Sequence, residues 1–181
     1  QGTAPAVGAK VYRFNKFDSC LSGWYTSNNT FASQGYIHLG AYFNVGDNGL
    51  NKQRGMIATP ALDSPLLSTA PVDCTLSFRG FVIQGRSAAL QVWVYDAASK
   101  TWAEVKRIDI HNSTGSTQAA LDYDSEAKKF VVTQEYSADS ETHKWYDYNC
   151  QLSLKQGDIV ALVAEKEDGA TMIDEIKITT K

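Results

Sequence analysis

Short stretches of alternating apolar and polar residues run through most of the chain, separated by clusters of Gly, Asn, Asp and Ser. A period of two is typical of strands that bury one face, and the longer period of an amphipathic helix is almost absent. The pattern therefore predicts an all-β chain. Strands are expected near residues 10–17, 36–40, 55–59, 74–83, 88–95, 102–110, 129–136, 145–154, 158–164 and 172–179.

This many strands without intervening helices favour a two-sheet antiparallel jelly-roll β-sandwich. The stretch 159–164 is apolar on both phases, so we expect a central strand that is covered on both faces. Residues 41–54 and 112–127 are predicted to form surface loops, and the acidic turn 165–169 is predicted to be a hairpin between the last two strands. A chain of 181 residues can bury one substantial core. We therefore expect a linker over residues 1–9 and a single domain over residues 10–181.

Two strands indicate which of their side chains face inward. In the first, the apolar set is Leu90, Val92 and Val94, so the opposite face holds Gln91, Trp93 and Tyr95. In the second, the inward set is Tyr146, Tyr148, Cys150 and Leu152, which leaves Trp145, Asp147, Asn149 and Gln151 outside. Large aromatic side chains on a nominally polar face require an explanation.

One explanation is a sugar-binding platform. Aromatic rings stack on the apolar face of a sugar, while amides and carboxylates bond its hydroxyl groups. The candidate residues are Gln91, Trp93, Tyr95, Trp145, Asp147 and Asn149, with Arg54 and Arg86 as groups that could reach a carboxylated sugar. The alternative is that a loop covers these rings or that they brace a neighbouring domain.

The final strand carries an acidic residue in a costly position. Strict alternation places Asp174 on the same face as Ile176 and Ile178, which directs a carboxylate toward the core. Such a group accepts hydrogen bonds from backbone N–H groups, titrates upward or binds a cation. Calcium needs about six to eight oxygen ligands, and Asp18 and Asn15 are further candidates to supply them. A structural calcium ion and a hydrogen-bonded structural role both remain open.

Charge and cysteine content narrow the function classes. The net charge is −3 and the basic residues are scattered, so a nucleic-acid partner is not expected. No apolar run is long enough for direct membrane insertion. Three cysteines are too few for a disulfide scaffold or a zinc site. Cys74 and Cys150 are interpreted as free, buried thiols, with a bridge between them as the alternative.

The chain contains none of the common catalytic motifs. We find no nucleophile elbow, no zinc-binding helix motif and no phosphate-cradling glycine loop. The paired carboxylates with which jelly-roll glycosidases cleave sugars are also missing. The sequence therefore predicts a protein that is not an enzyme.

The order of these features resembles a broad group of extracellular jelly-roll modules. These are MAM domains, cleaved-adhesin or choice-of-anchor modules of bacterial surface proteins, and galactose-binding-like carbohydrate-binding modules. The shared elements are Phe14 to Asp18 followed by Gly23-Trp24, Ile57 to Leu62, Cys74 to Phe78, Leu90 to Val94 followed by Trp102, Trp145 followed by Leu152 to Leu154, and Ile173 to Ile176. MAM domains carry paired cysteines that this chain lacks, so the bacterial modules fit better.

The resemblance implies a non-catalytic module that is secreted or displayed at the cell surface. Its partners would be a glycan or a cell-surface protein, beside neighbouring domains of the same polypeptide. The resemblance also implies that the Asp of the final strand, Asp174 here, helps to hold a structural calcium ion near the start of the chain. The alternative function is a structural spacer that presents a neighbouring domain, and a carbohydrate-active enzyme is a third choice.

Overall fold

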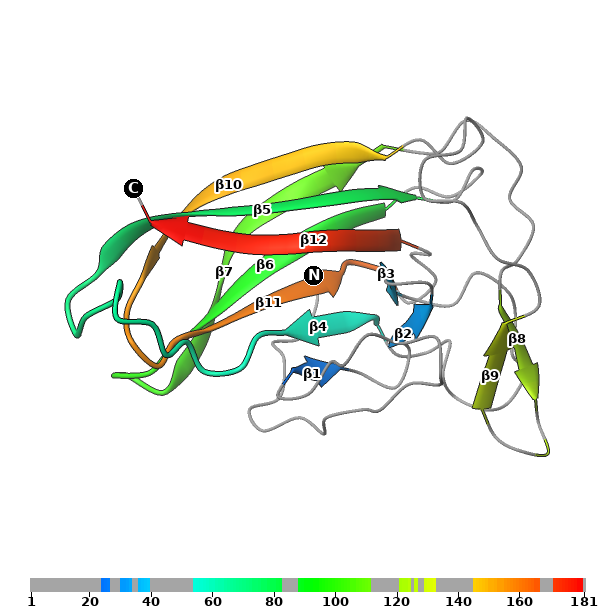
Figure 1. Ribbon diagram of the computed structural model, residues 1–181, viewed down its shortest axis with the longest axis horizontal. Helices are drawn as coiled ribbons and strands as arrows, with labels where there is room; N and C mark the ends of the chain where they lie inside the picture. The colour runs from blue at the N-terminus through cyan, green and yellow to red at the C-terminus, as the bar shows by residue number, and fades with distance from the viewer. Residues whose placement is uncertain are drawn as a thin grey trace.

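The computed structural model describes residues 24–26, 30–33, 36–39, 54–82, 88–111, 121–124, 126, 129–132, 145–166 and 171–180. Over these residues the chain forms strands joined by turns and contains no helix (Figure 1). The strands are β1 (Tyr25–Thr26), β2 (Thr30–Ser33), β3 (Tyr36–Leu39), β4 (Met56–Ala58), β5 (Val72–Val82), β6 (Ala88–Asp96), β7 (Thr101–Ile110), β8 (Leu121–Asp124), β9 (Lys129–Val132), β10 (Tyr146–Leu154), β11 (Ile159–Ala164) and β12 (Thr171–Thr180).

Two antiparallel five-stranded sheets pack face to face. The first sheet has the order β1, β4, β11, β6, β7, and the second sheet has the order β10, β5, β12, β3, β2. The chain crosses between the sheets at each step from β4 to β5 to β6 and again from β10 to β11 to β12. These crossings confirm the predicted jelly-roll sandwich, because a simple meander would keep consecutive strands in one sheet.

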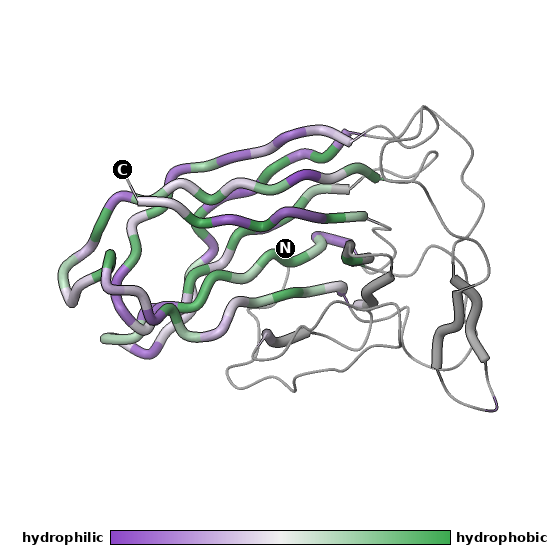
Figure 2. The backbone as a smooth tube through the Cα atoms, in the orientation of Figure 1, coloured by the Kyte–Doolittle hydropathy of each residue, from purple (hydrophilic) through white to green (hydrophobic). Residues whose placement is uncertain are grey.

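The inward faces of the two sheets form one hydrophobic core. In β5 the residues Cys74, Leu76 and Phe78 are buried and alternate with more accessible polar ones, and the same alternation is visible along the strands in Figure 2. The core also contains the predicted inward set of β6, namely Leu90, Val92 and Val94, and it is joined by Tyr148, Cys150 and Leu152 of β10. The predicted inward orientation is therefore confirmed for Leu90, Val92 and Val94 and for Tyr148, Cys150 and Leu152, whereas Tyr146 is not part of the core.

Strand β11 is central in the first sheet, between β4 and β6, and is buried along nearly its whole length. Its inward residues Val160 and Leu162 join the main core. Its outward residues Ala161 and Val163 form a second buried cluster with Met56 and Ala58. The prediction of a central strand covered on both faces is confirmed.

Three parts of the predicted strand pattern were wrong or incomplete. The short strands β1 and β2 were not expected, and β8 lies inside the stretch 112–127 that was predicted to be a loop. The acidic turn after β11 is not a hairpin, because β11 and β12 belong to different sheets. Period-two patterning does not show in which sheet a strand lies, and strands this short carry too little pattern to detect. The predicted linker 1–9 and strand 10–17 lie outside the described residues.

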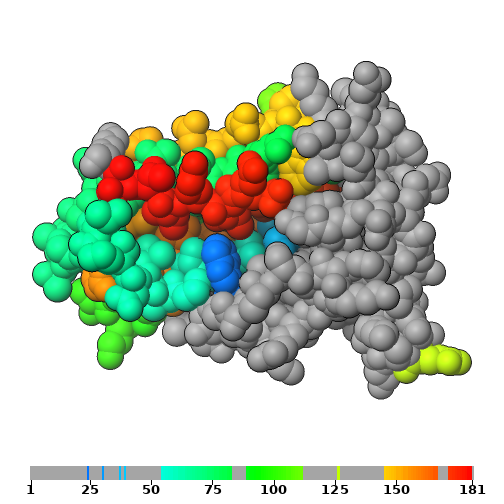
Figure 3. Space-filling model, viewed as in Figure 1, coloured from blue at the N-terminus to red at the C-terminus, as the bar shows by residue number. Residues whose placement is uncertain are grey.

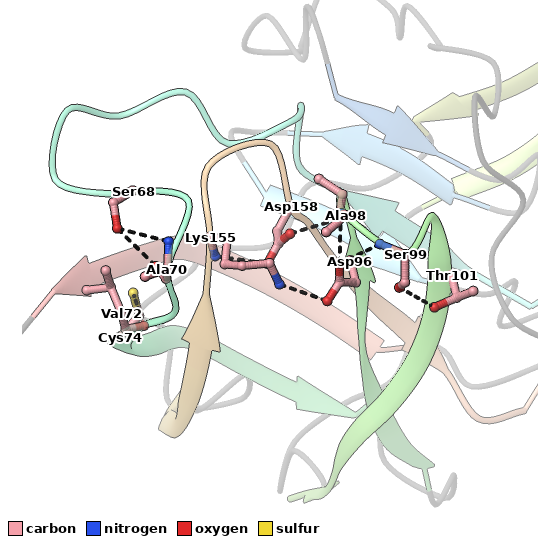
Figure 4. A network of polar contacts seen from close by, with 11 residues as sticks. Ser68, Ala70, Val72, Cys74, Asp96, Ala98, Ser99, Thr101, Lys155 and Asp158 are labelled. Carbon is pink, nitrogen blue, oxygen red and sulfur yellow. Dashed lines mark hydrogen bonds and ion pairs between the residues drawn. The ribbon is translucent and has the colours of Figure 1, made fainter.

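A polar network ties two turns together at one end of the sandwich (Figure 4). The buried carboxylate of Asp158 accepts hydrogen bonds from the backbone N–H groups of Ala97 and Lys155, at 3.0 and 2.9 Å. Lys155 Nζ donates to Asp96 Oδ2 at 2.7 Å. Asp96 Oδ1 in turn accepts from the backbone N–H groups of Ala98 and Ser99. The network therefore joins the β6–β7 turn to the β10–β11 turn.

This network predicts a specific acid sensitivity. The bond from Lys155 and the two turn N–H groups lower the pKa of Asp96 to about 2. Since the folded pKa lies below the unfolded one, the stabilisation is present above about pH 4 and is lost as the pH falls toward 2. We expect Asp96→Asn to lose less thermal stability than the native protein between pH 5 and pH 2.5, as measured by circular dichroism. If the melting temperatures of the variant and of the native protein fell in parallel with pH, the role of Asp96 in this acid sensitivity would be contradicted.

Gly80 permits the close approach of β5 and β12. A Cβ built at this position would lie 2.8 Å from the backbone oxygen of Met172, which cannot move away without breaking the sheet. We expect Gly80→Ala to lower the free energy of unfolding by about 1–3 kcal/mol, as measured by urea denaturation. Ser77→Ala, three residues away on the same strand, is the matched control and should change stability by less than about 0.5 kcal/mol. If Gly80→Ala unfolded at the same urea concentration as the native protein, the close approach of β5 and β12 at this position would be contradicted.

Candidate functional site

The outward face of the second sheet carries a polar groove of about 570 Å³ across β10, β5 and β12. We call it the groove, and it is lined by Ser77, Phe78, Arg79, Asp147, Tyr148, Asn149, Glu175, Ile176 and Lys177. Strand pairing explains which side chains meet there. Asp147 lies opposite Arg79, and Asn149 lies opposite Ser77, which is paired with Lys177 on its other side. Figure 3 shows the side chains of β12 (red) as a continuous band on the surface, beside those of β5 and β10.

Arg79 occupies the middle of the groove. Its Nε lies 3.9 Å from Asp147 Oδ1 and 4.0 Å from Glu175 Oε2. The arginine side chain is 30% exposed, against 92% for Asp147 and 64% for Glu175. The two carboxylates therefore stand in solvent on either side of a partly buried guanidinium. At such exposure the ion pairs add little stability.

The acid of the final strand does not face the core as predicted. The pairing of β12 with β5 shifts register between Asp174 and Lys177, so one extra residue is inserted at this point. Asp174 lies opposite Arg79, an outward-facing residue of β5, whereas Ile173 on one side of the bulge and Ile176 and Ile178 on the other side contact the core. Strict alternation was wrong here, because a bulge reverses the phase of the strand.

The predicted calcium ligands are only partly described. Asp174 is partly buried. The pKa of its carboxyl is raised, mainly because burial disfavours the charged form. Within the described ranges, no group of three or more His, Cys, Asp or Glu side chains is arranged to hold a metal ion. Asp18 and Asn15 lie outside those ranges, so the calcium site stays a prediction. The fully buried carboxylate is instead Asp158, which backbone N–H groups satisfy.

Trp145 was predicted to lie outside but is buried, with 9% of its surface exposed. It immediately precedes β10, and its ring packs edge-on against Phe81 with centroids 4.9 Å apart. The guanidinium of Arg79 lies 5.6 Å above the same ring. The indole therefore packs beneath the end of the groove and does not form a stacking platform. The prediction was wrong because Trp145 lies before the first residue of β10, where the alternation of that strand does not apply.

The other half of the candidate set lies on the first sheet. Gln91 is 1% exposed, and its Oε1 accepts hydrogen bonds from Arg54 Nη1 at 2.8 Å and from Trp93 Nε1 at 3.1 Å. Tyr95 packs against Trp102, with ring centroids 5.4 Å apart. Trp93 and Trp102 also pack on the buried outward cluster of this sheet. The structure therefore groups Arg54, Gln91 and Trp93 but separates them from Asp147 and Asn149. Arg86 lies outside the described residues.

Ordered contacts fix the walls of the groove from the core side. Tyr148 stacks on Phe78 with centroids 5.3 Å apart, and its hydroxyl accepts a hydrogen bond from the backbone N–H of His111 at 2.8 Å. Burial raises the pKa of Tyr148, so the hydroxyl stays protonated. Cys74 and Cys150 are free thiols on neighbouring strands, which confirms that they are not bridged; Cys74 is buried and Cys150 is partly buried. Burial raises the pKa of each thiol.

Four polar residues of the groove were missed from the sequence, namely Ser77, Arg79, Glu175 and Lys177. The outward orientation of Ser77 and Arg79 could have been read from the alternation of Cys74, Leu76 and Phe78 in β5. No local signal shows that β5 lies between β10 and β12, because that order is set by long-range pairing.

Comparison with known proteins gives the following similarities. No protein-family model matches the chain, and no curated protein matches it. Solved structures with a similar arrangement include a family 35 carbohydrate binding module from an environmental isolate, with 18% identity over 80% of this chain and 86% of that one and a TM-score of 0.45. CBM35 from Paenibacillus barcinonensis has 12% identity over 88% and 94% of the two chains and a TM-score of 0.47.

A family 35 carbohydrate binding module from Clostridium thermocellum has 13% identity over 81% and 89% of the two chains and a TM-score of 0.45. These similarities are too distant to assign the chain to a family, and the fold assignment rests on its strand pairing. The resemblance to MAM and cleaved-adhesin modules stays a prediction. Over the ranges that the structure covers, no helix has the length and hydrophobicity needed to span a membrane.

The buried position of Trp145 predicts that its replacement acts on stability. We expect Trp145→Ala to lower the free energy of unfolding by about 3–5 kcal/mol, because a large aromatic side chain leaves a cavity beside Phe81. Trp145→Phe keeps an aromatic ring in contact with Phe81 and should lower the free energy of unfolding by less. Val105→Ala, at an exposed position of β7, should change stability by less than about 0.5 kcal/mol. Chemical denaturation of the three variants measures this, and a native-like Trp145→Ala would show that the indole is not a core residue.

Proposed function

We propose that this chain is a non-catalytic glycan-binding module of an exported protein, and that it binds its ligand in the groove. The observation that carries the proposal is the set of exposed polar side chains that three adjacent strands place around Arg79. Arg79, Lys177 and Ser77 supply hydrogen-bond donors, whereas Asp147 and Glu175 supply acceptors and Asn149 supplies both. Sugar hydroxyl groups donate and accept hydrogen bonds, so such a mixed surface is complementary to them.

The strands give this surface the rigidity that weak polar contacts need. β5 pairs continuously with β10 from Tyr146 to Leu154, and it pairs with β12 on the other side except at the bulge. Side chains that are held on paired strands lose less conformational freedom on binding than side chains on loops. A chain of neutral sugars could therefore be held by several hydrogen bonds without an enclosed pocket.

Two aromatic residues on the first sheet are candidates for a separate ligand contact. Trp93 and Tyr95 are partly buried, and Trp93 is tied to Gln91 by its indole N–H. Their ring faces lie on the opposite side of the sandwich from Asp147 and Asn149. One bound sugar cannot contact both groups, and we assign the main site to the groove.

The groove predicts a loss of glycan affinity on substitution of its central residues. We expect Arg79→Ala and Asn149→Ala each to raise the dissociation constant for the bound polysaccharide about tenfold, because each removes hydrogen bonds to the ligand. Affinity electrophoresis against a panel of soluble polysaccharides, followed by calorimetry, measures this effect. Arg107→Ala is the matched control, since it removes an ion-paired arginine from the first sheet.

Two results would overturn the proposal. One is that no polysaccharide retards the native protein, which would favour the spacer alternative. The other is that the native protein binds a glycan and that only Trp93→Ala abolishes this binding, while Arg79→Ala and Asn149→Ala bind it with the affinity of the native protein. That outcome would move the site to the first sheet.

A further inference from the structure

The groove is lined by two basic and two acidic side chains, and the arginine at its centre is the one that lies between the two acids. Arg79 and Lys177 are its cations, and Asp147 and Glu175 are its anions, with Asp174 on the same rung as Arg79. Nε of Arg79 lies 3.9 and 4.0 Å from the carboxylates of Asp147 and Glu175. The positive charge that could attract an anionic ligand is therefore already flanked by two negative charges.

The backbone holds one of these carboxylates in place at a conformational cost. Glu175 has a φ of 53°, in the left-handed region that non-glycine side chains rarely adopt. It lies within the bulge between Asp174 and Lys177, and bulges re-aim side chains near binding sites. The other described non-glycine residue with positive φ is Lys100, in the tight turn between β6 and β7. At position 175 the bulge itself accounts for the left-handed backbone, and the same geometry directs the glutamate side chain toward Arg79.

We infer that Asp147 and Glu175 are specificity-determining residues that restrict the groove to neutral, hydroxyl-rich glycans and exclude glycans that carry carboxylate or sulfate groups. This inference rests on the proposed function. A sugar carboxylate that reached Arg79 would come close to the carboxylates of Asp147 and Glu175. At these solvent-exposed positions the repulsion between like charges is modest and is screened by salt, and it is enough to weaken binding about tenfold. Neutral hydroxyl groups meet no such repulsion, because they can donate to Asp147 and Glu175 while they accept from Arg79.

The test compares neutral and uronate-containing polysaccharides on the native protein and on the double variant Asp147→Asn/Glu175→Gln. The neutral probes are xylan, β-glucan and galactomannan, and the anionic probes are polygalacturonate and alginate. We expect the native protein to bind at least one neutral probe and to bind the uronates at least about tenfold more weakly. The double variant should gain about tenfold in affinity for the uronates at low salt and less at high salt, with neutral binding changed less than about threefold.

Matched controls separate a local effect from a change in net charge. The double variant Glu104→Gln/Asp109→Asn removes two acidic charges from β7, on the other sheet, and should leave the neutral-to-uronate preference unchanged. Glu175→Gly removes the carboxylate and the strained conformation together. It should also gain uronate affinity, and it should melt at a temperature no lower than that of the native protein.

The outcomes distinguish the two proposals. Equal binding of uronates and neutral glycans by the native protein, with both abolished by Arg79→Ala, would overturn the specificity inference and leave the proposed function standing. An equal gain of uronate affinity in the β7 double variant would also overturn it. Failure to bind any probe would instead remove the proposed function itself.

Discussion

The pairing of β5 between β10 and β12 is the constraint on which the rest of the structure depends. Cys74, Leu76 and Phe78 of β5 enter the core, so the intervening residues Thr75, Ser77 and Arg79 must point outward. β10 and β12 extend each of these positions into a rung across the sheet. The requirement to bury one face of β5 thus also builds the polar face of the groove.

The bulge in β12 changes what that sheet presents. Without the extra residue, the phase that buries Ile176 and Ile178 would carry Asp174 into the core, where a charged group is costly. The bulge keeps the isoleucines on both sides of it in contact with the core and leaves Asp174 outside. It also places Glu175 beside Arg79, so one local irregularity both avoids a buried charge and adds a carboxylate to the groove.

The two sheets differ in what their outward faces do. The first sheet buries Met56, Ala58, Ala161 and Val163 on this side, and two hydrogen bonds hold the buried Gln91 there. The exposed charges of this sheet lie on its edge strand β7. The second sheet exposes charged and amide groups along β10 and β12. This asymmetry explains why the groove, and not the aromatic surface, offers the larger set of hydrogen-bonding groups. The Asp96, Lys155 and Asp158 network ties the β6–β7 turn of the first sheet to the β10–β11 turn, which connects the two sheets.

The sequence by itself determined the strand content, the inward residues of β6 and β10 and the buried position of β11, because these follow from the period-two geometry of a single strand. It also singled out Asp147 and Asn149. Only the tertiary structure decided that Arg79, Glu175 and Lys177 lie beside them, that Trp145 is buried and that Asp174 faces outward. Those features depend on hydrogen bonds between strands that are distant along the chain, and on a bulge that reverses the alternation of β12 between Ile173 and Ile176, which strict alternation along one strand does not allow for.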